Sequence, residues 1–181
     1  MRGFSLTELM IVLALLAVIA AMAIPRINTT RYKADAAGYL VRTLLQTAQR
    51  NAITRQSNVI VSFDQATNQL RIVQDYNNND TLNTTDLVKF RKLEEGGQFA
   101  KPTWAGVNGI TPTDAVIGNA LRTVSSMTSI IFRRDGSAST NAEIYVTIRS
   151  NVPTEYRAIN LIAATGTIEL YRWSGAAWIR M

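Results

Sequence analysis

Apolar and polar positions follow three successive patterns along this chain. The sixteen residues from Leu9 to Ile24 are all apolar. Over residues 34–52, apolar residues recur at spacings of three and four, which indicates one face of an α-helix. From Ser57 the period falls to two, which is typical of half-buried β-strands. The pattern therefore predicts a long helix followed by a β-rich domain.

We expect one helix over residues 4–56, kinked near Pro25 because proline removes a backbone donor. Residues 4–24 form a transmembrane segment, and they are long enough to cross a bilayer only if Glu8 lies inside the span. Residues 25–56 form a stem that packs on the globular domain. The apolar stripe of this stem comprises Leu40, Val41, Leu44, Leu45 and Ala48.

Residues 57–181 are predicted to be one globular β domain. Strands are expected at 58–64, 69–74, 86–93, 129–133, 143–149, 156–163, 167–173 and 177–180. Residues 96–128 are rich in glycine and predict loops and short strands. Short strands between regular turn signals favour antiparallel sheets packed as a sandwich. The fold class is α+β: a long kinked N-terminal helix on an antiparallel β-sandwich-like domain.

Glu8 is the only charged residue between Phe4 and Ile24. A carboxylate at the centre of a membrane helix costs about 2.5–3.5 kcal/mol, and less near its edge. An acid in such a place indicates a functional site, and its natural partner is an amine.

Three simpler interpretations of this N-terminal stretch are a plain membrane anchor, a buried core helix and a secretory signal peptide. The segment Ala21-Met22-Ala23 has the small-residue form of a signal-peptidase site. Against a signal peptide, a single Arg2 precedes the apolar run, and Glu8 is foreign to its apolar region.

The segment Gly3-Phe4-Ser5-Leu6-Thr7-Glu8 resembles the class III signal of type IV pilins and pseudopilins. The resemblance implies a leader of residues 1–3, which a prepilin peptidase removes by cutting after Gly3. It also implies N-methylation of Phe4, and assembly through an ion pair between Glu8 and the Phe4 amine of a neighbouring subunit. Pro25 matches a proline that many pilins carry.

One long helix followed by strands looks like the GspH/FimT-type pseudopilins and minor pilins. Phe132-Arg133-Arg134-Asp135-Gly136-Ser137 resembles their F-x-x-D/N-G turn, and residues 157–172, with Gly166, resemble their closing hairpin. The resemblance implies a structural subunit of a type II secretion pseudopilus or a type IV pilus. Its partners would be other filament subunits, the prepilin peptidase, the inner-membrane assembly platform and, before assembly, lipid.

The same resemblance implies a location. The chain would sit in the inner membrane as a single-pass protein with its globular domain outside the cytoplasm, and later in a periplasmic pseudopilus or a surface pilus. A membrane-tethered ligand-binding domain that never polymerises is the alternative outside this class.

Composition argues against catalysis. The 181 residues include no cysteine and no histidine, which removes disulfides, the usual catalytic triads and most zinc sites. The net charge of +6 is concentrated in the stem, where six basic residues face Asp35 alone. That stem would contact lipid headgroups or acidic neighbours, or present a solvated helix face. We predict that the chain is not an enzyme and has no certain cofactor.

A polar run between two predicted strands has the spacing of a calcium loop. Such a loop of twelve residues places oxygen ligands at positions 1, 3, 5, 7, 9 and 12. From Asp75 these positions are Asp75, Asn77, Asn79, Thr81 through its carbonyl, Asn83 and Asp86. The sixth position is Asp80 rather than glycine, and Asp86 at the twelfth resembles dockerin-type loops. The alternative is a polar hairpin loop.

The C-terminal region suggests a second ligand. FimT-like minor pilins of competent bacteria bind DNA through basic residues near the C-terminus, and Arg157, Arg172 and Arg180 lie in that region beside aromatic residues. Arginine and aromatic side chains hold phosphates and stack bases. The alternative function is therefore a DNA-binding minor pilin for uptake in natural transformation.

Overall fold

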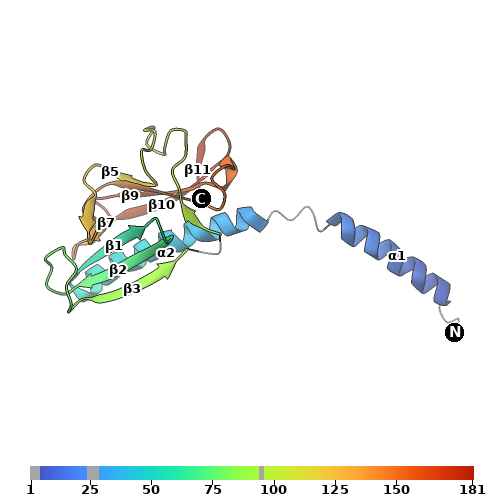
Figure 1. The fold of residues 1–181 in the computed structure, drawn as a ribbon, viewed down its shortest axis with the longest axis horizontal. Helices are drawn as coiled ribbons and strands as arrows, with labels where there is room; N and C mark the ends of the chain where they lie inside the picture. Colours follow the sequence, from blue (N-terminus) through green and yellow to red (C-terminus); the bar gives the residue numbers. More distant parts are fainter. Residues whose placement is uncertain (1–4, 24–28, 94–95) are drawn as a thin grey trace.

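The computed structural model describes residues 5–23, 29–93 and 96–181 (Figure 1). Helix α1 (Leu6–Ala23) and helix α2 (Thr29–Arg55) cover most of the predicted 4–56 helix. Pro25 and the predicted kink lie outside the described residues. None of the helices in the described ranges combines the length and apolarity needed to cross a bilayer. The predicted span, 4–24, extends beyond the described residues at both ends.

Helix α2 packs on the β domain through small and aliphatic residues spaced three and four apart. Its buried residues are Ala34, Ala37, Gly38, Val41, Leu45, Ala48 and Ala52. Gly38 lets α2 lie close to Leu170 of the second sheet, because a Cβ at this position would be only 3.0 Å from Leu170 Cδ1. The helix ends where Gln56 adopts a left-handed φ of 53°, a common way to terminate a helix. The predicted stripe is confirmed, with Val41 and Leu45 fully buried.

The strands form two antiparallel sheets. The first has the order β3-β2-β1-β7-β6 and comprises β1 (Asn58–Asp64), β2 (Gln69–Asp75), β3 (Leu87–Lys92), β6 (Arg122–Val124) and β7 (Met127–Phe132). The second has the order β11-β10-β9-β8-β4, with β5 paired to β8. It comprises β4 (Gln98–Phe99), β5 (Val116–Gly118), β8 (Ala142–Thr147), β9 (Arg157–Ile162), β10 (Thr167–Trp173) and β11 (Trp178–Arg180). A short 3₁₀ turn (Pro153–Glu155) precedes β9.

One apolar core joins both sheets to α2. It combines the buried face of α2 with residues such as Val61 and Phe132 of the first sheet and Ile144 and Leu170 of the second. None of the α1 residues whose side chains are described, 6–20, belongs to it. The predicted α+β class, with an N-terminal helix packed on antiparallel sheets, is confirmed.

All eight predicted strands are confirmed within two residues at each end, and the largest differences, of two residues, occur at one end of two of them. The strand expected at 143–149 ends at Thr147, because Ile148 and Arg149 lead into the turn before Pro153. Met127 and Thr128 extend β7 beyond its predicted start, because they pair with β6. That pairing lies in the 96–128 region, where only loops and short strands were expected.

Candidate functional site

The N-terminal end of α1 is closed by two reciprocal hydrogen bonds. The Ser5 amide donates to Glu8 Oε2 at 2.9 Å, and the Glu8 amide donates to Ser5 Oγ at 3.4 Å. This is a capping box, which satisfies two amides that the helix leaves without partners. The Glu8 carboxylate is thereby directed toward the N-terminal end of its own helix. Gly3 and Phe4, the predicted processing residues, lie outside the described residues.

Apolar side chains are exposed around the whole circumference of α1. Leu9, Met10, Ile11, Leu13 and Ile19 are each more than half exposed. A helix that is apolar on every side is normally buried, in a protein core or a membrane. Because α1 adds nothing to the core of the β domain, its surface needs cover from lipid or from other apolar helices.

The start of α2 is tied to β9 by an ion pair. Arg157 Nε donates to Asp35 Oδ1 at 2.6 Å, and its Nη1 donates to the carbonyls of Thr154 and Tyr156. The Arg157 side chain is only 3% exposed, whereas that of Asp35 is 31% exposed. The sequence marked one member of this pair, because Asp35 is the only acidic residue among residues 26–56. It did not indicate Arg157 as the partner.

A second ion pair lies beside the first. Arg149 donates to the buried carboxylate of Glu155 and also to Thr30 Oγ1 of α2, at 3.2 Å. The hydrogen bonds from Arg149 hold the pKa of Glu155 below its usual value. The first two turns of α2 are thus held by two arginines of the second sheet and its connections.

Acidification is expected to weaken this contact. Because the folded-state pKa of Glu155 is lowered, its contribution to stability is present above the unfolded value of about 4.3 and is lost as the pH falls through the folded-state value. Glu155→Gln should therefore reduce stability by about 1 kcal/mol at pH 7, a small figure because Arg149 is half exposed, and should flatten the pH dependence. Urea unfolding between pH 3 and 7 measures both effects. Asp135→Asn removes an exposed carboxylate whose pKa is lowered mainly by hydrogen bonds from Ser137 instead, so it shows how much of the pH dependence a carboxylate held by a serine rather than an arginine contributes. An unchanged pH slope in Glu155→Gln would contradict the assignment.

The three arginines of the DNA hypothesis do not form one surface. Arg157 is buried against Asp35, so its guanidinium is not presented to a phosphate. Arg180 is exposed, but its Nη2 lies 2.9 Å from Glu169 Oε1. Arg172 is exposed and lines a small cavity with Arg31 and Asp35. The structure removes Arg157 from the DNA hypothesis.

The aromatic residues near the C-terminus pack on one another. Trp104 stacks on Trp173 with ring centroids 4.9 Å apart, and Trp173 meets Trp178 edge to face at 5.2 Å. Trp178 Nε1 also donates to the Ala105 carbonyl at 2.9 Å. These contacts fix the chain end against the loop that contains Trp104, so the tryptophans are held in a packing role.

The polar run 75–86 forms the connection between β2 and β3. Asp75 is fully buried, whereas Asn77, Asn79 and Thr81 are exposed, and Asn83 and Asp86 are half-buried. Asp86 joins the two ends of the loop, since its carboxylate accepts from the amides of Tyr76 at 3.3 Å and Asn83 at 2.8 Å. The structure thus brings the first and last predicted calcium ligands to neighbouring places.

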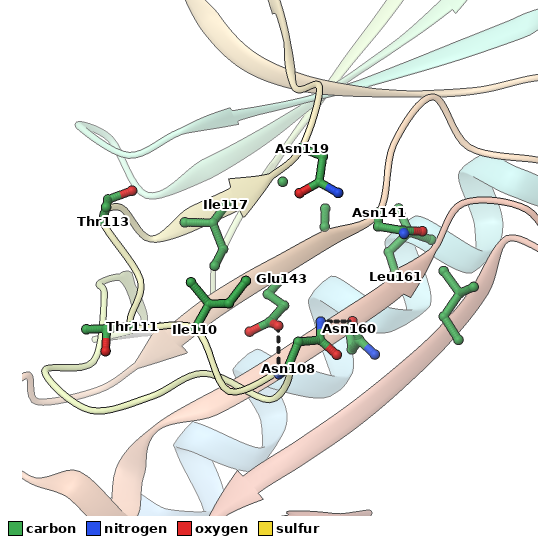
Figure 2. Close-up of a pocket in the computed structure, with 13 residues that line it drawn as sticks. Asn108, Ile110, Thr111, Thr113, Ile117, Asn119, Asn141, Glu143, Asn160 and Leu161 are labelled. Atoms are coloured by element: carbon green, nitrogen blue, oxygen red, sulfur yellow. Dashed lines mark hydrogen bonds between the residues drawn. The ribbon is translucent and has the colours of Figure 1, made fainter.

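A cavity of about 500 Å³, which the sequence did not indicate, lies between the 108–119 segment and the outer face of β8 and β9 (Figure 2). Figure 2 shows Ile110 on the loop and Ile117 on β5, with Glu143 of β8 and Asn160 of β9 nearby. Glu143 accepts from the amides of Val107 and Asn108, each at 3.0 Å, and from the Tyr145 hydroxyl. Among the described residues that line the cavity it is the only ionisable one, and its oxygens hold the loop. The cavity therefore offers amide and apolar contacts rather than acid–base chemistry.

Two known protein families match this chain, one at its N-terminal segment and one over most of α2 and of the β domain. The prokaryotic N-terminal methylation motif matches residues 1–24, and the model of the type II transport protein GspH matches residues 40–166. The second match spans more than half of the chain. The chain belongs to the GspH family. This membership makes it a pseudopilin, a structural subunit of the type II secretion class, and the family and fold are those of structural proteins rather than enzymes.

The GspH-family fold is also found among solved structures. Two structures of the minor pseudopilin EpsH from the type II secretion system of Vibrio cholerae are similar to this chain. One is 14% identical and covers 76% of this chain and 95% of that chain, with a TM-score of 0.50. The other is 16% identical and covers 77% of this chain and 94% of that chain, with a TM-score of 0.51. These likenesses concern the fold. A search of curated proteins finds no match.

Proposed function

We propose that this GspH-family chain is a minor subunit of a type II secretion pseudopilus and enters the filament through α1. A prepilin peptidase removes residues 1–3 by cutting after Gly3, and Phe4 is then N-methylated. Before assembly the chain is held in the inner membrane with its β domain in the periplasm. The observation that carries this proposal is α1 itself: over residues 6–20, where its side chains are described, it exposes apolar side chains on every side, and none of these residues belongs to the core of the β domain.

The capping box gives Glu8 a role both before and after assembly. In the isolated chain, the carboxylate accepts from the Ser5 amide and is not left without a partner. In a filament, the Phe4 amine of a neighbouring subunit would approach the same carboxylate. A charge pair in apolar surroundings tolerates little displacement, because either charge without its partner is costly there. The pair therefore sets the axial register between subunits.

The chain offers a test that separates processing from assembly. In cells with a prepilin peptidase and the secretion machine, the parent chain should lose residues 1–3, gain one methyl group and cross-link into the pseudopilus. Gly3→Val should remain full length and outside the filament, because a branched side chain replaces the glycine at the cut site. Mass spectrometry of the purified chain reports cleavage and methylation, and cross-linking to other pseudopilins reports assembly. Assembly of uncleaved Gly3→Val would refute the proposal and favour a non-polymerising tethered domain.

Glu8→Gln is the matched variant for the charge. Glutamine retains the capping box, because either Glu or Gln at that position accepts from the N-cap amide, but it carries no charge. We expect this variant to be cleaved yet to cross-link at least tenfold less. If it assembled as well as the parent chain, the ion pair with the neighbouring amine would be unnecessary. The DNA alternative, which now rests on Arg172 and Arg180, gains no support from the described surface.

A further inference from the structure

Asp75 has a carboxylate oxygen that the fold leaves without a partner. The residue ends β2 and its side chain is fully buried. Its Oδ2 accepts from the Asp80 amide at 2.8 Å, which turns the carboxylate toward the 75–86 loop. Its Oδ1 receives no hydrogen bond from any described residue. Buried polar atoms almost always have a partner, so this oxygen calls for an explanation, and a cation bound in the loop would supply one.

We propose that the 75–86 loop binds one calcium ion, with the Oδ1 atom of Asp75 as its innermost ligand. The other ligands are the side-chain oxygens of Asn77, Asn79, Asn83 and Asp86 and the main-chain carbonyl of Thr81. Calcium takes six to eight oxygen ligands in flexible geometry. Oxygen donors of this kind suit a hard cation and are poor ligands for the softer transition metals.

The backbone removes the main objection to this loop, which is the aspartate at its sixth position. Asp80 adopts a left-handed φ of 61°, the conformation for which calcium loops use glycine at that place. Its carboxylate contacts neighbouring residues of the fold and is not a ligand of the proposed ion. Oδ1 accepts from Asn58 Nδ2 at 2.8 Å, and Oδ2 lies 3.7 Å from Arg133 Nη2. Asp80 thus holds the turn in place without being a ligand.

The loop is fixed to the first sheet by residues that are not among the proposed ligands. Asn78 Oδ1 accepts from the Asn58 amide at 2.7 Å, and Leu82 packs against the apolar cluster that contains Ile60 and Val73. No group of three or more acidic, histidine or cysteine side chains suited to a metal is present in the described part of the chain. The proposed site needs only two, Asp75 and Asp86, because amides and a carbonyl supply the other oxygens.

Asn83 indicates where the ion would sit. Its Nδ2 group donates to Asn79 Oδ1 at 3.1 Å and is 3.5 Å from the carbonyl oxygen of Thr81. A partly positive amide group therefore bridges two of the proposed ligands. Rotation of the Asn83 amide would replace that donor with an oxygen as the cation enters. Two acids among the ligands and an exposed loop correspond to a dissociation constant of about 10⁻⁴–10⁻³ M, the range of extracellular modules.

Thermal unfolding of the full chain in detergent, with calcium or with a chelator, tests the proposal. The melting temperature should rise by several degrees at 10 mM calcium, which exceeds the expected dissociation constant at least about tenfold. Asp75→Asn should lose this rise and bind calcium at least tenfold more weakly by titration calorimetry. In chelator, the same variant should be no less stable than the parent chain, because it removes a buried charge without a partner and keeps an acceptor for the Asp80 amide. A purely structural Asp75 would give the opposite result in chelator.

Asp64→Asn is the matched control. Asp64 caps the β1–β2 turn by accepting from the Ala66 and Thr67 amides, so this variant should lose stability equally with calcium and with chelator and keep the calcium response. No binding heat and no change in melting temperature for the parent chain would overturn the proposal. Equal shifts for the parent chain and Asp75→Asn, or equal shifts with magnesium and calcium, would indicate ionic screening and overturn it as well.

Discussion

Asp35→Ala is expected to lower the free energy of unfolding by about 3 kcal/mol, because it leaves the buried guanidinium of Arg157 without its carboxylate. Removal of one member of a buried pair typically costs about 3–5 kcal/mol. The lower end applies here because Arg157 Nη1 still donates to two backbone carbonyls. Urea unfolding of the purified chain measures the loss.

The double variant Asp35→Ala/Arg157→Met separates the charge from the contact. It removes the buried charge and keeps an apolar side chain beside α2, so it should recover at least half of the loss. If Asp35→Ala cost less than about 1 kcal/mol, as exposed pairs do, the ion pair would not be what holds the start of α2 to β9.

Gly166→Ala is expected to destabilise the chain by on the order of 3 kcal/mol, because two costs combine. Gly166 has a left-handed φ of 62°, and a Cβ there would lie 2.2 Å from the Gly136 carbonyl oxygen and 2.0 Å from Gln49 Nε2. Gln49 of α2 donates to that same carbonyl at 2.8 Å, so it cannot move aside without losing the bond. A lower midpoint of urea unfolding with an unchanged slope is the expected result.

Gly109→Ala is the control for backbone strain alone. Gly109 has a comparable φ of 81°, but nothing lies within 4 Å of the Cβ position. It should therefore cost only about 1–2 kcal/mol for the left-handed conformation. Equal losses in the two variants would mean that the packing of Gln49 between the two turns adds nothing.

Two sets of contacts hold α2 against the β domain, one near each end of the helix. Asp35 and Arg157 act near its start, and Gln49 with Gly136 and Gly166 near its finish. Since α2 follows α1 in the chain, these contacts determine how firmly the β domain is held on the helical part that enters the filament. Variants that loosen them should also reduce assembly into the pseudopilus, even with residues 1–8 intact.

Local patterns were sufficient to predict most of the fold. β1 and β10 have the predicted bounds, because alternating residues with turn residues at 65–68 and at Thr165-Gly166 specify hairpins locally. Residues 96–128 could not be predicted in this way. Their strands β4 and β5 are short and pair with β8, far along the chain, so their position depends on packing rather than on local pattern.

For the candidate sites, the sequence by itself determined the N-terminal signal, the acid within the apolar run and the oxygen spacing of residues 75–86, because each is a feature of neighbouring residues. Only the tertiary structure decided which side chains are available. It buried Arg157 against Asp35, brought Gly136 and Gly166 together at Gln49, and left one oxygen of Asp75 buried without a partner. Burial and partnership depend on contacts between distant segments, which residue spacing does not encode.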